Sequence, residues 1–499
     1  MRASPRHPDT VFKPGRLIAG ILCAVALAST SLAAPTATTF RENPDGVGHI
    51  LVVPYYTVQS GNATLLNIVN TDVVNGKAVK LRFRSANNAD SLYDFTLFLA
   101  PGDVWAAEVS QNPVTGMPRL GTTDSSCTLP TQINADFSAE RLDRNAANFA
   151  NDAREGYVEV ITMANLLPGT DIFTATTPVK NVLPQACSQG TAIPPTLERL
   201  LTPSGITASK LAEPTTGLFA NWSIFNVANA TSWSGAATAL QAVNAASAPA
   251  TGAMVLQPQT REPVTKPLTE LTTDPLMRAG LVQAVLADLP DLSTPYVQGM
   301  APMAQITALG AALAKTSVSN EYFTDDSVQA QTDWVFSMPT RRYEVAMDVP
   351  RRQVYFAAND ANQYFGPGGV ELRSHAVPRI CMRNFGIEVR NRTAGLDPQG
   401  IDDDFVLSSY GNPELVCGAV SVLSFNAGDD LAPSALSASA VRLNLEVTDA
   451  DGWILLRTSS YNRGTPLVGY AASKAVSTNV GNGMAGSFGL AWPHRHSRP

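Results

Sequence analysis

Acidic residues that cluster on predicted loops are the part of this chain best suited to chemistry. Asp397, Asp402, Asp403 and Asp404 lie within a span of eight residues. Hard carboxylate oxygens are the ligands that Ca²⁺ prefers, and Ca²⁺ is plentiful outside cells. We therefore take Asp397, Asp402 and Asp404 as candidate Ca²⁺ ligands, although no acidic run in the chain matches the twelve-residue EF-hand loop. The alternative interpretation is a set of solvated turns.

Histidine, the usual general base, is scarce. Outside the first 33 residues the chain has only His49, His375, His494 and His496. The last two stand within six residues of the C-terminus, where chains commonly fray. Only His49 and His375 are then left to serve a serine or cysteine triad, and a zinc site of three histidines is disfavoured. We assign no catalytic residue.

A glycine-rich motif occurs near the C-terminus. Residues Gly481–Gly486 read Gly-Asn-Gly-Met-Ala-Gly and match the pattern G-x-G-x-x-G. The dinucleotide fingerprint also needs a strand before it, a helix after it and an acidic residue about 20 positions further on. Only 13 residues follow Gly486, so we treat the match as chance and assign no cofactor-binding residue.

The segment 1–33 has the pattern of a signal peptide. Four cations precede the apolar run Leu17–Leu27, which is too short to cross a bilayer core, since that takes about 20 residues. Ser31 and Ala33 place small residues where a signal peptidase requires them, so we expect cleavage after Ala33. An anchor that is never cleaved is the alternative.

Cleavage after Ala33 alters the charge of the chain. The formal net charge moves from −7 to −10, because four Lys or Arg residues and one Asp leave with the signal. Such an acidic chain is a poor match for nucleic acid, whose binding needs clustered cations. No later stretch reaches 18 apolar residues, so we expect no transmembrane helix in the mature chain.

Four of the five cysteines remain after cleavage: Cys127, Cys187, Cys381 and Cys417. An even number of cysteines in an exported chain indicates two disulfides. Three connectivities are open, and we favour Cys127–Cys187 with Cys381–Cys417, since each pair then closes a loop within its own half of the chain. A four-cysteine metal site is the alternative, but the chain lacks the usual C-x-x-C pairs.

The elements that must position these residues are predicted mainly as strands. Between His49 and Ser110 five short apolar or alternating runs are separated by turn residues. In Lys77–Arg84 the apolar side chains face one way, and Lys80, Arg82 and Arg84 face the other. Strict period-two alternation is typical of half-buried antiparallel strands. We predict a mainly β protein with immunoglobulin-like β-sandwich domains and a small helical insertion.

Composition divides the chain into six segments. They are a signal peptide at 1–33, an N-terminal β-sandwich domain at 34–205, a Pro/Ala/Ser-rich connection with one strand at 206–275, a helical insertion at 276–316, a C-terminal β domain at 317–480 and a Gly-rich, basic tail at 481–499. The expected helices have one apolar face each, at 281–289 and at 303–313.

Two further expectations concern the second half of the chain. Val441–Val447 alternates, and a turn at Asp449–Gly452 leads into Trp453–Thr458, which predicts a β-hairpin. Aromatic side chains bind sugars by stacking when they are exposed. We expect most of the six tryptophans to pack in the core, and only Trp233 and Trp492 stand in polar or loop-like surroundings.

Several short segments of the sequence are similar to segments that occur together in one group of proteins. They are Val53–Thr57 followed by Thr64–Asn70, Asp103–Trp105, Arg154–Glu159, Thr332–Val335 with Pro339–Arg342, and Gly464–Gly469. In these segments the chain resembles a family of uncharacterised exported proteobacterial proteins, sometimes labelled cell-surface proteins. The resemblance implies export, and it carries no activity or site residue.

The leading hypothesis is therefore an exported, non-catalytic protein of the cell surface, the outer membrane or the periplasm. Its role would be structural or adhesive, with envelope components or further copies of itself as partners. No cofactor is expected beyond Ca²⁺. The second hypothesis is a secreted module that binds glycan or Ca²⁺. The third is a secreted hydrolase that uses paired carboxylates, whose separation only a structure can supply.

Overall fold

A computed structural model describes residues 36–140, 142, 149–178, 187, 192–256, 290–348, 352–357, 364–373, 378–383, 386–391, 416–426, 434–438, 441–447, 449–458, 463–477 and 486–499. The candidate Ca²⁺ ligands Asp397, Asp402 and Asp404 lie outside these ranges, as do the segment 1–33, His375 and the helix predicted at 281–289. Residues Pro35–Pro499 group into one compact unit.

Two sheets of antiparallel strands form a first β-sandwich, because the alternating runs near the N-terminus bury one apolar face each. Its seven-stranded sheet has the order β1 (Thr39–Asn43), β12 (Thr238–Val243), β2 (Ile50–Thr57), β9 (Glu155–Leu166), β4 (Gly76–Ser85), β5 (Ser91–Leu99) and β8 (Cys127–Leu129). Its five-stranded sheet has the order β11 (Thr231–Ala236), β10 (Leu218–Asn226), β3 (Asn62–Asn70), β6 (Val104–Gln111) and β7 (Pro118–Gly121).

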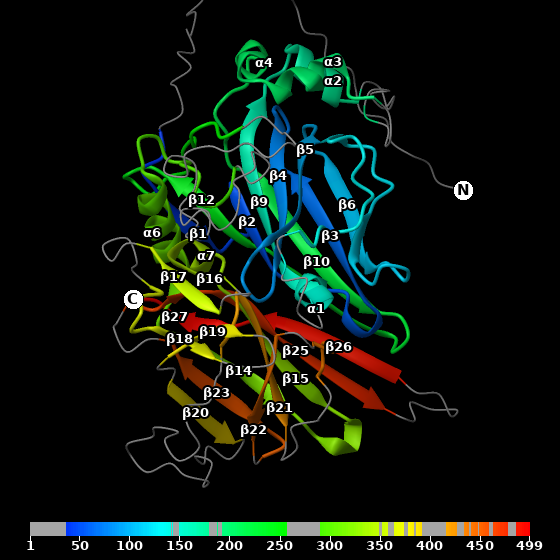
Figure 1. Ribbon diagram of the computed structural model, residues 1–499, viewed down its shortest axis with the longest axis vertical. Helices are drawn as coiled ribbons and strands as arrows, with labels where there is room; N and C mark the ends of the chain where they lie inside the picture. Colours follow the sequence, from blue (N-terminus) through cyan, green and yellow to red (C-terminus); the bar gives the residue numbers. More distant parts are fainter. Residues whose placement is uncertain are drawn as a thin grey trace, which may run out of the picture. The chain divides into compact units, whose positions relative to one another are not determined.

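A second sandwich lies below the first in Figure 1. One of its sheets has the order β20 (Gly386–Asn391), β23 (Asp451–Arg457), β14 (Ser317–Phe323) and β27 (Arg495–Ser497). The other has the order β22 (Arg442–Glu446), β21 (Val420–Asn426), β15 (Gln331–Ser337), β25 (Val468–Ser477) and β26 (Gly486–Pro493). The fold is thus mainly β and built of β-sandwiches, as the alternation predicts.

Short elements complete the described structure. The paired strands are β13 (Ala314–Lys315) with β24 (Thr465–Pro466), β16 (Val345–Asp348) with β17 (Gln353–Phe356), and β18 (Val370–Arg373) with β19 (Arg379–Met382). The α-helices are α1 (Phe149–Arg154), α2 (Asp171–Thr176), α3 (Pro195–Glu198), α4 (Pro203–Ala208), α6 (Pro302–Leu313) and α7 (Arg341–Glu344). The 3₁₀-helices are η1 (Gln59–Gly61), η3 (Arg199–Leu201) and η5 (Asp326–Val328).

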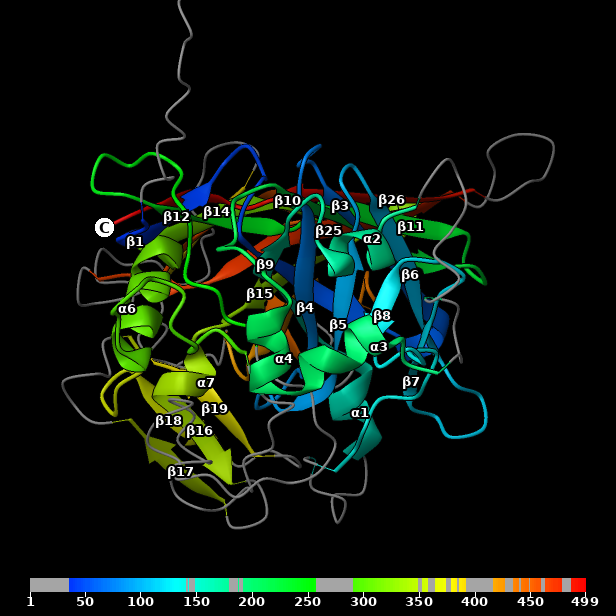
Figure 2. The ribbon, with the colours of Figure 1, turned by 90° about the horizontal axis from the view of Figure 1, so that it is seen from above.

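The longest helix, α6, packs beside β1 (Figure 2). Its buried face includes Ile306, Leu309 and Leu313, so the helix predicted at 303–313 is confirmed as core-facing. The helices α2, α3 and α4 lie at the end of the first sandwich that is away from the second (Figure 1). Among the described residues, no helix has both the length and the apolar composition needed to cross a membrane.

The predicted connection at 206–275 contains three strands, where the sequence indicated one. Besides β10, it supplies β11 and β12, and β12 pairs with both β1 and β2 of the large sheet. The small Ala, Ser, Thr and Gly side chains of this segment show no clear alternation, so the local pattern is weak. β11 and β12 are strands because they pair with strands that are distant in the sequence.

The C-terminal residues likewise form strands where a tail was expected. β26 is the edge of the five-stranded sheet, and the chain then crosses to the other sheet as β27. His494, between them, is buried and not frayed. The segment 481–485 is outside the described residues.

The predicted hairpin between 441 and 458 is wrong. β22 pairs in parallel with β21, whereas β23 lies between β20 and β14 in the other sheet. A short polar turn favours a hairpin only when the two strands belong to one sheet. Here the chain changes sheets at Asp449–Gly452 instead.

The middle strand β15 of the sheet formed by β22, β21, β15, β25 and β26 is buried on both faces. Trp334 and Phe336 of β15 pack in the core of the second sandwich. Val335, between them, packs with the core of the first sandwich, and so does Tyr470 of β25. The rings of Trp222 and Tyr470 lie 4.4 Å apart across this junction. One sheet therefore contributes side chains to both hydrophobic cores.

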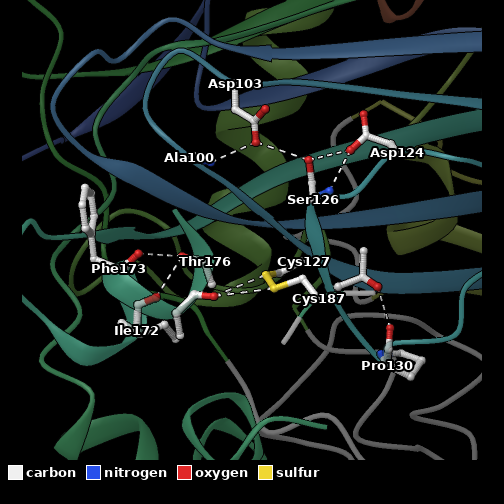
Figure 3. The surroundings of a disulfide bond; sticks show 12 residues. Ala100, Asp103, Asp124, Ser126, Cys127, Pro130, Ile172, Phe173, Thr176 and Cys187 are labelled. Atoms are coloured by element: carbon white, nitrogen blue, oxygen red, sulfur yellow. Dashed lines mark hydrogen bonds between the residues drawn. A yellow bond between two sulfur atoms is a disulfide. The ribbon is translucent and has the colours of Figure 1, made fainter. Parts of the chain in front are cut away.

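Both favoured disulfides are present: Cys127 is bonded to Cys187, and Cys381 to Cys417. Figure 3 shows the first bond beside α2, where both sulfurs lie within 3.7 Å of the carbonyl oxygen of Ala175. It ties Cys187 to β8, an edge of the seven-stranded sheet. The connectivity predicted from loop closure within each half is confirmed.

Candidate ligand-binding cleft and the buried charges behind it

Two of the three described histidines, His49 and His494, are buried, and the third, His496, is exposed. Desolvation by burial lowers the pKa of His49 to about 3 and the pKa of His494 to about 3. Both imidazoles are therefore neutral at physiological pH. Neither touches an open cleft with a nucleophile, and each is held inside a core. A serine or cysteine triad on His49 has no support in this geometry.

The exposed tryptophan is Trp453, and the sequence did not single it out. Trp233 is buried, and its indole Nε1–H donates to the carbonyl of Ser473 at 2.9 Å. Trp453, predicted to be in the core, is 39% exposed. The reason is strand phase: Ile454 and Leu456 of β23 face the core, so Trp453 lies on the outer face of that strand.

Trp453 borders a cleft with a volume of about 510 Å³. This volume is within the range of ordinary ligand pockets. The cleft draws its lining from four strands of the second sandwich. The lining residues are Glu321, Tyr322, Phe323, Asp451, Gly452, Trp453, Ser473, Lys474, Ala475, Phe488, Leu490 and Trp492.

One side of the cleft is formed by β14 and β23. Their register places Glu321 opposite Trp453 and Phe323 opposite Asp451. Directly opposed residues share a face of an antiparallel sheet, and diagonal neighbours lie within reach of long side chains. An indole is thus flanked by two carboxylates, one across from it and one two residues before it.

The other side is formed by β25 and β26. Trp492 is opposite Ala471, and Ala471 belongs to the core of the second sandwich, so Trp492, Leu490 and Phe488 lie on the core-facing side of β26. This apolar stripe continues beyond the part that the opposite sheet covers. Phe488 is 59% exposed and Leu490 is 60% exposed. Large apolar side chains exposed together commonly mark a binding surface.

The edge of β14 that borders the cleft has its backbone groups already bonded. β27 pairs only with Ser317–Ser319, so Glu321 and Phe323 have no strand neighbour on that side among the described residues. Instead, the indole of Trp334 donates to the Glu321 carbonyl at 3.0 Å. The Thr332 hydroxyl accepts from the Phe323 amide and donates to the Phe323 carbonyl, both at 3.0 Å. Side chains thus protect this edge from pairing with another strand.

Asn320 fixes the floor of the cleft. Its Oδ1 accepts from the indole Nε1–H of Trp492 at 2.7 Å, and its amide lies 3.1 Å from Nδ1 of His494. The Nε2 of His494 lies 3.2 Å from the carbonyl oxygen of Val335. A carbonyl can only accept, so the neutral imidazole carries its proton on Nε2 and accepts on Nδ1. This chain of bonds holds the Trp492 ring in one position.

The first sandwich supports the β26 wall from behind. The backbone of β26 at Gly489 approaches β11 so closely that a Cβ there would lie 2.1 Å from the carbonyl oxygen of Ser232. Only glycine permits this contact. The hydroxyls of Thr231 and Ser487 are also hydrogen-bonded across the same gap. The cleft is therefore built on a wall that both sandwiches hold in place.

Period-two alternation suggested that the cations of β4 lie on a solvated face. The structure shows that they do not. Lys80, Arg82 and Arg84 are all buried. Arg84 donates to Glu159 at 3.1 and 3.3 Å and to the Tyr343 hydroxyl at 2.7 Å. Although desolvation opposes its charge, the Glu159 carboxylate raises the pKa of Arg84 well above its ordinary value. The alternation is correct, but elements that come later in the chain cover the polar face.

The neighbouring cations of β4 are paired in the same layer. Lys80 forms an ion pair with Asp94, and Nη1 of Arg82 lies 3.8 Å from Asp291. Burying a charge without a partner costs several kcal/mol, so such groups must be matched. This layer is enclosed and each of its cations lies beside a carboxylate, so it serves as a structural junction and not as an open site.

The turn between β4 and β5, Ala86–Asp90, carries this junction into the second half of the chain. Asn88 donates to the Met347 carbonyl at 2.7 Å and accepts from the Met347 amide at 3.0 Å. Arg342 pairs with Asp90 at 3.1 Å, and Arg341 donates to the Asn87 carbonyl at 2.8 Å. A buried hydrogen-bonded contact of this extent holds the two sandwiches in one arrangement.

No family model matches the chain, and no curated protein or solved structure compared with it matches either. The resemblance to exported cell-surface proteins therefore stays a prediction. Among the described residues no cluster of three or more His, Cys, Asp or Glu side chains is placed to hold a metal ion. Ca²⁺ binding by Asp397, Asp402 and Asp404 also stays a prediction, because those residues are outside the described ranges.

Sequence reasoning missed the cleft because its parts are distant along the chain. Phe488, Leu490 and Trp492 alternate with small residues, and this period-two pattern was available in the segment taken as a tail. Their meeting with Glu321 and Trp453 was not readable, since it depends on β26 and β14 belonging to opposite sheets.

Proposed function

We propose that this chain is an exported, non-catalytic protein of the cell envelope or cell surface that acts by adhesion, with the cleft as its binding surface. The proposal rests on a cleft of about 510 Å³ whose apolar and aromatic side chains are exposed on a well-braced β-sandwich. Two disulfides and a buried charged junction support the rigidity. A preformed site of this kind loses little conformational entropy when it binds.

The test is binding of the purified mature chain to isolated cell envelopes of its source. We expect saturable binding that Phe488→Ala with Leu490→Ala weakens at least tenfold. The control is Val227→Ala, because Val227 is an exposed apolar residue that does not line the cleft. Circular dichroism and thermal unfolding check that each variant is folded.

Two results would contradict this proposal. One is the absence of binding to envelopes. The other is binding that the cleft variants and Val227→Ala affect equally. Export is tested separately by the N-terminal residue of the protein recovered from outside the cytoplasm, which we expect to be Ala34. An intact Met1 on that protein would contradict cleavage after Ala33.

A further inference from the structure

The chemistry of the cleft indicates which ligand it binds. We propose that it binds a neutral oligosaccharide of pyranose sugars, with Trp453 as the stacking platform. This inference rests on the proposed adhesive function, because it names the ligand class of the same cleft. It is carried by three observations: the aromatic surfaces, the placement of the polar groups and the sealed strand edge.

The aromatic surfaces suit the apolar faces of sugar rings. A pyranose presents axial C–H groups on one face, and these pack on the electron-rich face of an indole. Trp453 is 39% exposed on the outer face of β23, and the Arg390 guanidinium lies 5.9 Å from the centre of its ring. Phe488 and Leu490 supply a second exposed apolar surface on β26. The cleft thus has two apolar walls for successive sugar units.

The polar groups stand where the equatorial hydroxyls of a stacked sugar would be. Glu321 is directly opposite Trp453, and Asp451 is two residues before it on the same face. Carboxylates accept hydrogen bonds from hydroxyls and often accept two. The Ser473 hydroxyl, opposite Leu490 on the β25 side of the cleft, donates to the Thr332 hydroxyl at 2.8 Å, and its oxygen can accept a further hydrogen bond. Few, well-placed polar groups on an apolar lining are typical of ligand sites.

Other occupants fit this cleft less well. A peptide strand finds its pairing edge closed, because Trp334 and Thr332 already bond the backbone of Glu321 and Phe323. An acyl chain would desolvate the carboxylates of Glu321 and Asp451, which line the cleft. Phosphate polymers are repelled by Glu321 and Asp451.

The test is isothermal titration calorimetry of the mature chain with soluble cello-, chito-, xylo-, manno-, malto- and galacto-oligosaccharides. We expect at least one of these probes to bind, Trp453→Ala to weaken that binding at least tenfold, and Asp451→Asn at least threefold. Trp453→Phe keeps an aromatic face and should retain most of the affinity. Phe225→Ala is the matched control, because Phe225 is 38% exposed but lies on β10 of the first sandwich.

The outcomes separate the ligand class from the function. Envelope binding that depends on Phe488 and Leu490, together with no binding to any oligosaccharide probe, would overturn the carbohydrate assignment and leave adhesion standing. Oligosaccharide binding that Trp453→Ala leaves unchanged would overturn the placement in this cleft. Release of new reducing ends from a bound probe would overturn the non-catalytic role. Loss of both kinds of binding would overturn both proposals.

Discussion

Arg84 shows how this protein manages charge in its interior. Its guanidinium is bonded to Glu159, to the Tyr343 hydroxyl and to the carbonyl of Ala89, and its centre lies 5.8 Å from the Tyr343 ring. A planar guanidinium with several fixed donors is well suited to such a buried site. The pairing must be complete, because each missing partner would leave a desolvated charge.

Glu159→Gln is expected to destabilise the fold strongly. The substitution leaves Arg84 buried and charged without its counter-ion, which costs about 3–5 kcal/mol of unfolding free energy. Urea unfolding of the wild type and the variant measures the difference. The control is Arg119→Gln, which breaks a pair with Asp136 on the surface and should cost about 1 kcal/mol or less. Equal losses in the two variants would show that burial does not decide the effect.

His494 should make the protein labile to acid. Its pKa is about 3 in the folded chain, mainly because of desolvation, and about 6.5 when the chain unfolds. As the pH falls below 6.5, the unfolded chain therefore binds this proton first. The contribution of His494 to stability is complete above pH 6.5 and is lost as the pH falls toward 3. Its upper bound is about 4–5 kcal/mol, at ~1.4 kcal/mol per pKa unit.

The measurement is the urea midpoint of the wild type and of His494→Gln between pH 4 and pH 7. We expect the variant to lose less stability over this range, although it starts lower at pH 7. The other titrating groups contribute equally to the two curves of stability against pH, so the difference between their slopes reports His494. One of these groups is Asp152, whose pKa is raised to about 7 mainly by desolvation. His496→Gln, at an exposed position, is the control. Parallel curves for the wild type and His494→Gln would refute the assignment.

At the scale of elements, the β4–β5 turn acts as the connection between the two halves. It contains no large apolar side chain, and it contacts the second half of the chain through hydrogen bonds from Asn87 and Asn88 and through the ion pair of Asp90 with Arg342. Asn88 bonds both the amide and the carbonyl of Met347, as a paired strand residue would. A short turn therefore gives the junction its register.

Asn88→Ala should weaken this junction. It leaves the amide and the carbonyl of Met347 buried without partners, and each such group costs about 1–3 kcal/mol. We expect a total loss of about 2–4 kcal/mol in chemical unfolding. Asn67→Ala is the control, since Asn67 is a half-exposed residue of β3, and its loss should stay near about 0.5 kcal/mol. A loss of unfolding free energy no larger than that of Asn67→Ala would contradict a stabilising role of Asn88 at the junction.

The disulfides and the strand edges act at this scale too. Cys127–Cys187 fixes the end of an edge strand, and Cys381–Cys417 joins β19 to the residues just before β21. The edge of β14 is closed by Trp334 and Thr332. Closed strand edges keep a β protein from pairing with other chains.

At the scale of the whole molecule, the two sandwiches should unfold together. The sheet of β22, β21, β15, β25 and β26 contributes to both cores, and Pro35–Pro499 forms one compact unit. We expect one calorimetric transition, with equal calorimetric and van't Hoff enthalpies as the criterion. Two resolved transitions in the wild type would show that the sandwiches are independent domains.

The alternation of residues near the N-terminus was enough to predict β2 to β6, because one face of each strand must be apolar. The cysteine count and the loop lengths were enough for both disulfides. Prediction failed where small residues carry no pattern, as in β11 and β12, and where the chain changes sheets, as between β22 and β23. In those places pairing with distant strands decides the structure.

The sequence by itself therefore indicated the fold class, favoured the cysteine pairs that are present and showed which residues of the N-terminal strands share a face, since these follow from local periodicity and chain connectivity. Tertiary structure alone decided which faces are covered: Lys80, Arg82 and Arg84 are buried, and Trp453 and Phe488 are exposed. The physical reason is that a strand's pattern states which residues share a face. Whether water or another sheet lies against that face depends on elements hundreds of residues away.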